Sequence, residues 1–159
     1  MFETSHLHPM IVHFPIALLI VGFLFDALSL FVKKEFFSNA GFYLLILGTL
    51  GVVAAYFSGT FAGSGISEAG SLKQALETHE GAAELALWLM VITAAIRIAL
   101  VIAKKYEGGF KYATIFLFLL GVLAIARTGF YGGDLVFRHA AGVQLNLGLD
   151  SGAADNGKE

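Results

Sequence analysis

Histidine is the residue type in this chain whose positions point most directly to chemistry. The chain has five in 159 residues: His6, His8 and His13 begin the first apolar stretch, His79 begins the third, and His139 follows the fourth. Imidazole holds haem iron and also binds copper, zinc and iron directly. The chain has no cysteine, which excludes disulfides, cysteine-ligated iron–sulfur clusters, thiolate zinc sites and covalent c-type haem. These residues therefore favour a haem or metal site made from histidines.

Four apolar stretches must position these histidines, at residues 9–32, 41–61, 81–103 and 112–131. Each has about 20 residues, which as a helix spans the roughly 30 Å hydrocarbon core of a bilayer. The chain is 57% hydrophobic and only 14% charged, whereas soluble domains are about 25% charged. The sequence predicts an all-α fold, an integral membrane four-helix bundle within residues 1–148, followed by a disordered polar tail at 149–159.

Lysines in two short loops predict the orientation of the bundle in the membrane. Five of the ten basic residues lie there: Lys33, Lys34, Lys104, Lys105 and Lys111. By the positive-inside rule these loops are cytoplasmic, so both termini face the outer side of a bacterial inner membrane. The first stretch is too long for a cleaved signal peptide and lacks a basic segment before it. All five histidines then lie on the extracytoplasmic side.

Two prolines shape the expected start of the first helix. Pro9 suits the first helical position, which puts His8 at the boundary of the helix. Pro15 cannot donate a backbone hydrogen bond, and the loosened turn is expected to aim His13 into the bundle. The sequence therefore favours His13 as the inward-facing histidine of this helix.

Local signals also mark one end of each of the third and fourth helices. Thr78 is the expected N-cap of the third helix, with His79 in its first turn. The pair Gly132–Gly133 is expected to end the fourth helix, because adjacent glycines disfavour helix. The following segment would then fold back and bring His139 over the outer face of the bundle.

Small residues recur at three- and four-residue steps in the predicted helices. They are Gly48, Gly51, Ala55, Ser58 and Ala62 in the second, Ala82, Ala83 and Ala86 in the third, and Gly121, Ala124, Thr128 and Gly132 in the fourth. Such stripes are typical of close packing between membrane helices, and they would also leave space for a flat prosthetic group. The same order of features occurs twice: an apolar span that begins at a histidine, then a pair of lysines, then a span that crosses back. This order indicates an internal two-helix repeat.

Ionisable residues inside the spans should be paired, because an isolated charge is costly in a bilayer. Asp26 and Arg97 both fall near the lysine-rich ends of their spans, which predicts an ion pair between the first and third helices. Arg127 falls close to the depth of the histidines, where it could pair with Glu84 or meet the propionates of a haem. Arg138 follows the fourth span and could neutralise a propionate as well.

The opening HLHPMIVHFPIALLIVGFLFD resembles the start of the DUF2231 family of predicted four-helix bacterial membrane proteins. The similarity continues with His79 opening the third span, Arg97 near its end, and GGDLVFRHAAGV after the fourth, and it covers roughly residues 6–145. Members are described mainly as proteins of unknown function, and some occur beside or fused to Rieske or cytochrome modules. The resemblance implies the fold, favours electron transfer, and points to His8, His13, His79 and His139.

The first function that fits is a membrane protein that binds a b-type haem, in electron transfer. A haem within a helical bundle commonly takes axial imidazoles from two helices, and needs no cysteine. The residues expected at this site are His13 and His79 as the axial pair, His8 and His139 close by, and Arg127 and Arg138 at the propionates.

Two other functions use the same histidines differently. One is a direct copper, zinc or iron site formed by His8, His13, His79 and His139, with Met10 as a soft ligand for Cu(I). The other is a cofactor-free subunit of a membrane complex, in which the histidines form hydrogen bonds or a proton path.

The lipid bilayer is the partner that the composition requires, and redox proteins or a second copy of the chain are further candidates. No basic stripe or glycine-rich phosphate loop indicates binding of nucleic acid or nucleotides. No Ser-His-Asp arrangement or carboxylate pair identifies catalytic residues. The sequence therefore leaves open whether the protein is an enzyme.

Overall fold

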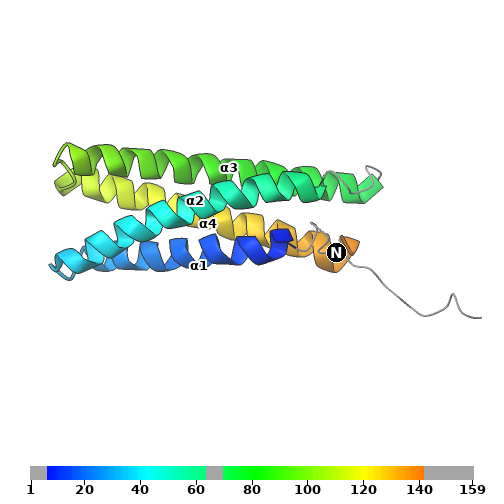
Figure 1. Cartoon of the computed structure of the whole chain (residues 1–159), viewed down its shortest axis with the longest axis horizontal. Helices are drawn as coiled ribbons and strands as arrows, with labels where there is room; N and C mark the ends of the chain where they lie inside the picture. Colours follow the sequence, from blue (N-terminus) through cyan, green and yellow to red (C-terminus); the bar gives the residue numbers. More distant parts are fainter. Residues whose placement is uncertain (1–6, 64–69, 142–159) are drawn as a thin grey trace, which may run out of the picture.

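Four helices make up almost all of the described chain. The computed structural model describes residues 7–63 and 70–141. The helices α1 (Leu7–Leu28), α2 (Glu35–Gly63), α3 (Gly70–Ile102) and α4 (Gly108–His139) run in alternating directions (Figure 1). The prediction of an all-α membrane bundle is confirmed, and no strand occurs in these two ranges. The predicted tail at 149–159 and His6 lie outside them.

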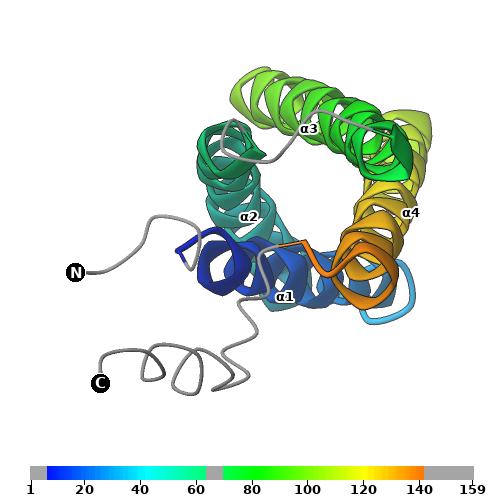
Figure 2. The same ribbon diagram turned by 90° about the vertical axis from the view of Figure 1, so that its right-hand side faces the viewer.

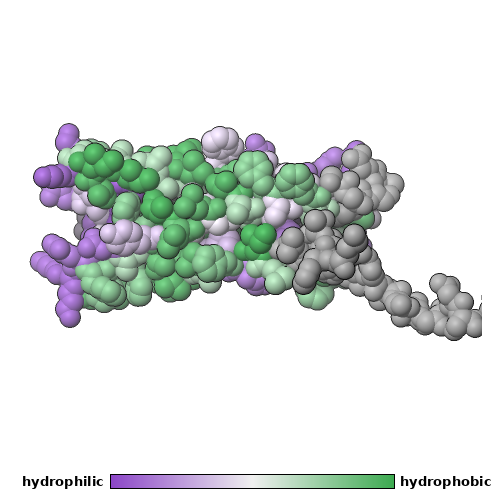
Figure 3. Space-filling model, viewed as in Figure 1, coloured by the Kyte–Doolittle hydropathy of each residue, from purple (hydrophilic) through white to green (hydrophobic). Residues whose placement is uncertain are grey.

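All four helices are long and apolar enough to cross a membrane. The shortest has 22 residues, which is a length of about 33 Å at 1.5 Å per residue. Large apolar side chains such as Phe14, Leu50 and Phe116 are exposed on the outer surface of the bundle. Hydrophobic residues cover most of the face shown in Figure 3. Lipid contact explains this exposure, so the protein is a multi-pass membrane protein.

The two ends of the bundle carry different residues. The α1–α2 and α3–α4 loops meet at one end, the lysine end, which contains Lys33, Lys34, Lys104 and Lys105 (Figure 1). Its hydrophilic side chains are visible in Figure 3. The opposite end, the histidine end, contains His8 and His79, and α4 finishes there at His139.

α3 begins well before the position that the local sequence signals mark. The helix starts at Gly70, and Thr78 lies inside it, where its hydroxyl donates to the Gln74 carbonyl at 2.8 Å. The prediction of an N-cap at Thr78 is therefore wrong. Most residues between Gly70 and His79 are good helix formers, so the helix extends beyond its apolar segment.

α4 continues through the glycine pair that was predicted to end it. Gly132–Gly133 is helical, and α4 ends at His139, after which the chain turns through a left-handed residue. The prediction that His139 folds back over the outer face is wrong. Leu135, only 6% exposed, anchors this last part of the helix. An ion pair between Asp134 and Arg138, one turn apart at 2.9 Å, supports it further.

The bundle consists of two helix pairs. α1 packs mainly against α2, and α3 packs mainly against α4. α1 and α3 lie diagonally across the bundle, as do α2 and α4 (Figure 2). Because diagonal helices also run in the same direction, the two pairs are related by an approximate twofold axis along the bundle.

Equivalent residues occupy equivalent places in the two pairs, as an internal repeat predicts. Leu19 of α1 fills the space left by Gly48 of α2, and Met90 of α3 fills the space left by Gly121 of α4. Asp26 and Arg97 are 71 positions apart in the sequence. The same separation relates two further pairs: Leu19 with Met90, and His8 with His79.

A buried ion pair joins the two halves near the lysine end. Arg97 Nη1 donates to Asp26 Oδ2 at 2.9 Å and Nη2 donates to Oδ1 at 3.1 Å, and both side chains are 1% exposed. The pair predicted from the sequence is therefore confirmed. Gly41 makes room for the carboxylate, because a Cβ there would lie 2.8 Å from Asp26 Cγ.

Two further residues complete the surroundings of Arg97. Ser38 accepts from Arg97 Nη2 through its carbonyl oxygen at 3.0 Å and its hydroxyl at 3.3 Å. The Tyr106 hydroxyl accepts from Nη1, and the Tyr106 ring centroid lies 3.4 Å from Arg97 Cζ. Burial raises the pKa of the Tyr106 hydroxyl, as does the Asp26 charge, while Arg97 opposes them. The phenol therefore stays neutral beside the guanidinium.

The interior changes character along the bundle. The largest fully buried side chains lie in its middle or toward the lysine end: Leu19, Asp26, Leu45, Met90, Thr93, Arg97, Thr114 and Phe118. Toward the histidine end α3 buries alanines instead, with Ala82 at 5% and Ala86 at 3% exposure. On its α3 side, the histidine end therefore buries smaller side chains than the rest of the bundle.

Candidate functional site at the histidine end

His8 lies in the first turn of α1 and reaches across to α2. Its Nδ1 is 2.9 Å from the Ser58 hydroxyl, and its ring packs over Gly59, where a Cβ would lie 3.0 Å from His8 Cε1. The Ser58 hydroxyl already donates to the Ala55 carbonyl at 2.9 Å, so it accepts from His8. Neutral His8 therefore has its proton on Nδ1 and a lone pair on Nε2.

His79 of α3 makes the same arrangement with α4. Its Nδ1 is 3.2 Å from the Thr128 carbonyl oxygen, and its ring packs over Gly132, where a Cβ would lie 3.2 Å from His79 Cε1. A carbonyl oxygen can only accept, so Nδ1 donates. Neutral His79 therefore also has its lone pair on Nε2.

Both imidazoles thus have the form that metal-binding histidines usually take. Such a histidine donates one ring N–H to a carbonyl or another acceptor, which fixes the tautomer and the ring orientation and leaves the second nitrogen to bind iron or another metal. His8 and His79 are half-buried, and they are close enough that a charge on His79 acts on His8. The structure therefore places these two histidines at the same end of the bundle, on the diagonal helices α1 and α3.

His13, in contrast, lies on the outer surface of α1. The side chain is exposed, and its Nδ1 is 2.5 Å from the Pro9 carbonyl oxygen within the same helix. Pro15 is buried and packs where Gly51 of α2 leaves space, with 2.9 Å between Pro15 Cβ and a Cβ added at Gly51. The proline therefore faces the bundle, and the expectation that it aims His13 inward is wrong.

The structure does not gather the predicted histidines into a direct metal site. His139 is the last residue of α4 and half-buried. In the described ranges no group of three or more histidine, aspartate or glutamate side chains is arranged to hold a metal ion. A bare copper or zinc site usually takes three or four protein ligands, whereas haem needs only one or two.

The two arginines predicted near this site have partners on the outer surface. Arg127 is exposed, and its Nε donates to the Tyr131 hydroxyl at 3.4 Å, one turn along α4. Arg138 is 75% exposed and pairs with Asp134. Neither arginine is directed by its contacts toward His8 or His79, and a propionate role for them stays a prediction.

Sequence reasoning missed the residues that orient the imidazoles. Ser58, Thr128 and Gly132 belong to the small-residue stripes, so their positions on the packed faces of α2 and α4 could be found from the sequence. Gly59 lies outside the stripe of α2. Which of these residues meets His8 or His79 depends on how each helix is rotated, and the stripes alone do not give that rotation.

Comparison with known proteins identifies a family but no characterised relative. A family model described as "Predicted membrane protein (DUF2231)" matches residues 4–145. No curated protein matches the chain, and no solved structure matches it.

Proposed function

The chain belongs to the DUF2231 family of predicted membrane proteins, and on the geometry of its histidine end we propose that it binds a b-type haem between His8 and His79. The observation that carries the proposal is that the two imidazoles have the same tautomer and the same kind of hydrogen bond. Each donates Nδ1–H to an acceptor on a neighbouring helix, and each keeps the lone pair of Nε2. A bound haem supplies a one-electron redox couple, so the proposed activity is electron transfer.

The surroundings of the pair support this ligand. Gly59 and Gly132 let the rings lie close to α2 and α4, and the buried residues of α3 between His79 and Met90 are the small Ala82 and Ala86. Helical bundles commonly build cofactor sites from side chains on facing helices. Ser58 and the Thr128 carbonyl hold the rings in one orientation, which limits the reorganisation that accompanies ligand binding.

Haem content of the native protein tests the proposal. The protein should be isolated from its own membranes in a mild detergent, and its non-covalent porphyrin and its metals should be quantified. One haem per chain is expected. Copper, zinc or iron at one ion per chain without porphyrin would favour the direct metal site instead. Neither porphyrin nor stoichiometric metal would leave the cofactor-free subunit as the better account.

The proposed orientation places the histidine end outside a bacterial cytoplasmic membrane, where an extracytoplasmic redox protein could reach the haem. This rests on the four lysines of the lysine end and on Lys111. An alkaline phosphatase fused after Glu159 is expected to be active, and the same enzyme inserted in the loop after Lys104 is expected to be inactive. The reverse pattern would overturn the orientation.

A glycine substitution on α4 should separate the histidine contact from general helix effects. Gly132→Ala puts a Cβ 3.2 Å from His79 Cε1, so the imidazole must move and haem retention should fall. Gly133→Ala is the matched control, because the nearest atom to its Cβ lies 4.0 Å away in Phe137. That change should leave haem content unaltered. Haem per chain is measured for both, and equal losses would show that His79 is not the affected group.

A further inference from the structure

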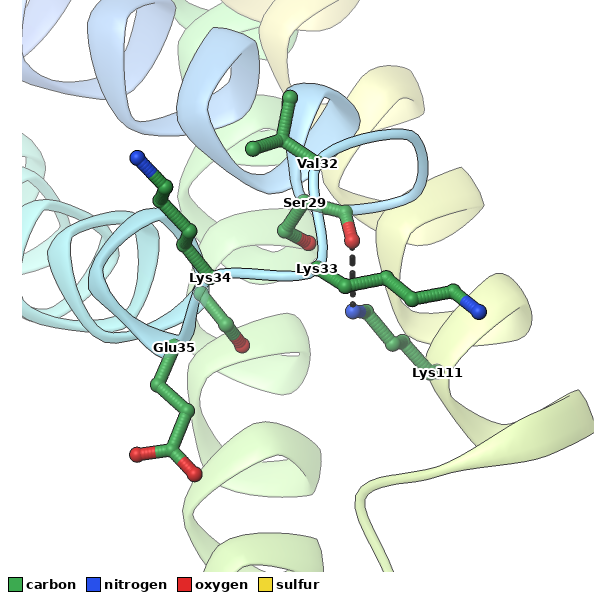
Figure 4. A pocket seen from close by; sticks show the side chains of 7 residues that line it. Ser29, Val32, Lys33, Lys34, Glu35 and Lys111 are labelled. Carbon is green, nitrogen blue, oxygen red and sulfur yellow. Dashed lines mark hydrogen bonds between the residues drawn. The ribbon is translucent and has the colours of Figure 1, made fainter.

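A recess at the lysine end carries a second set of groups that the histidine site does not use. It has a volume of about 320 Å³ and lies between the α1–α2 loop and the first turn of α4 (Figure 4). Its lining residues are Ser29, Val32, Lys33, Lys34, Glu35, Ser38 and Lys111. Three of the four charged residues are cationic, so the recess favours an anion.

The ammonium groups are not arranged evenly around the recess. Lys33 and Lys111 lie on the same side of the recess, with their side chains running in opposite directions, whereas Lys34 and Glu35 extend toward the other side (Figure 4). Lys111 is half-buried, and its Nζ donates to the Ser29 carbonyl oxygen at 3.2 Å. That bond fixes the position of one ammonium group and leaves it two further N–H donors. An anion between Lys33 and Lys111 would therefore meet two charges, with the Glu35 carboxylate directed elsewhere.

The polar wall of the recess is part of the buried ion-pair network. Ser38 accepts hydrogen bonds from Arg97, and the Ser29 hydroxyl donates to the Asp26 carbonyl oxygen at 2.6 Å. The two serines are thus held by partners deeper in the bundle. The recess has fixed polar sides, unlike a group of lysines on a mobile surface loop.

The depth of the recess, and exposed aromatic residues that neighbour its lysines in the sequence, point to the source of the anion. It lies where the apolar helices end, which is the level of lipid headgroups. Phe31 is 82% exposed two residues before Lys33, and Phe110 is 59% exposed immediately before Lys111. An acyl chain could lie against these rings while its phosphate meets the lysines. A free phosphate ion would leave the aromatic surface unused.

We propose that this recess binds the phosphate group of an anionic phospholipid, held by Lys33 and Lys111. The site is independent of the histidine end. On this basis one lipid occupies the junction of α1, α2 and α4 next to the Asp26–Arg97 pair. The other basic loop has no part in the site, since neither Lys104 nor Lys105 lines the recess.

Native mass spectrometry of the full chain in detergent tests the proposal, with phosphatidylglycerol as the probe and phosphatidylcholine as the neutral comparison. Wild-type protein should retain one phosphatidylglycerol in preference to phosphatidylcholine. Each basic group near an anionic surface contributes about a factor of five to affinity. Lys33→Gln with Lys111→Gln should therefore weaken binding by about 25-fold. Lys104→Gln with Lys105→Gln, the same charge change at the same end, should alter it less than about twofold.

Lys33→Gln alone guards against misfolding, because within the described residues the Lys33 side chain makes no hydrogen bond or ion pair, whereas Lys111 bonds to the Ser29 carbonyl. It should weaken binding about fivefold, and Lys33→Arg should restore binding. Equal losses in the two double variants would show a diffuse surface effect and overturn the site. Equal retention of both lipids by wild-type protein would overturn it as well. Complete displacement of the lipid by millimolar inorganic phosphate would assign the recess to free phosphate and contradict a lipid ligand.

Discussion

His8→Ala and His79→Ala are each expected to abolish haem retention while the protein still inserts in the membrane. Each variant would remove one of the two Nε2 atoms proposed to bind the iron, and a single imidazole at this partly open end would not hold the haem through purification. The bundle itself should persist, because its largest buried side chains and its ion pair lie in the middle or toward the lysine end. Haem per chain after purification and the amount of protein in the membrane fraction are the measurements.

His13→Ala is the matched control for these variants. It removes an imidazole from the same helix as His8, five positions away, but from the outer surface. Its haem content should equal that of the wild type. Ser58→Ala removes only the acceptor that orients His8 and should weaken haem binding by about 10- to 100-fold. Loss of haem in His13→Ala together with full retention in His8→Ala would exchange the roles of the two residues and contradict the proposed pair.

Asp26→Asn and Arg97→Gln should each destabilise the protein by about 3–5 kcal/mol, because each leaves an unpaired charge in a site that is 1% exposed. The double variant should be more stable than either single variant, since both charges are gone. Unfolding in detergent micelles, followed by circular dichroism, measures the three differences in the free energy of unfolding. Additive effects would show that the two side chains do not interact.

The pair Asp134 and Arg138 provides a surface comparison within the same chain. Its N–O distance is also 2.9 Å, but the Arg138 side chain is 75% exposed. Asp134→Asn should therefore change the stability by about 0.5 kcal/mol or less. A cost as large as that of Asp26→Asn would mean that burial is not what makes the Asp26–Arg97 pair important.

The sequence predicts the four helices well because the bilayer imposes a length and a composition on each of them. It also predicts the Asp26–Arg97 pair, since a charge inside an apolar span needs a partner and these two fall at the same depth. The helix ends are harder to predict. Past the lipid boundary, as in the stretch before His79 and at Gly132–Gly133, local signals compete with packing against the neighbouring helix.

The choice between His8 and His13 shows what the sequence does not determine. In a membrane helix both the lipid-facing and the buried residues are apolar, so the pattern does not reveal how the helix is rotated. The proline geometry favours His13. In the structure Pro15 itself packs against Gly51, which turns the neighbouring His13 outward. His8 is held by contacts with Ser58 and Gly59, which lie about fifty positions further along the chain.

The ion-pair surroundings give a second example. Ser38 and Tyr106 both bind Arg97, yet each lies in or beside a loop and follows no periodic pattern. Lys111 is visible in the sequence as part of the positive-inside signal, but its bond to the Ser29 carbonyl depends on α4 packing beside the end of α1. These contacts arise from the assembly of the two helix pairs and not from any single segment.

The coordination state of the haem iron in the native protein tests the central claim most directly. Protein isolated gently from its own membranes should be examined by optical absorption in the oxidised and reduced states and by electron paramagnetic resonance. Two axial imidazoles predict a six-coordinate, low-spin haem in both oxidation states. A high-spin, five-coordinate haem, or a protein that carries no haem at all, would contradict the assignment of His8 and His79 as a pair of axial ligands.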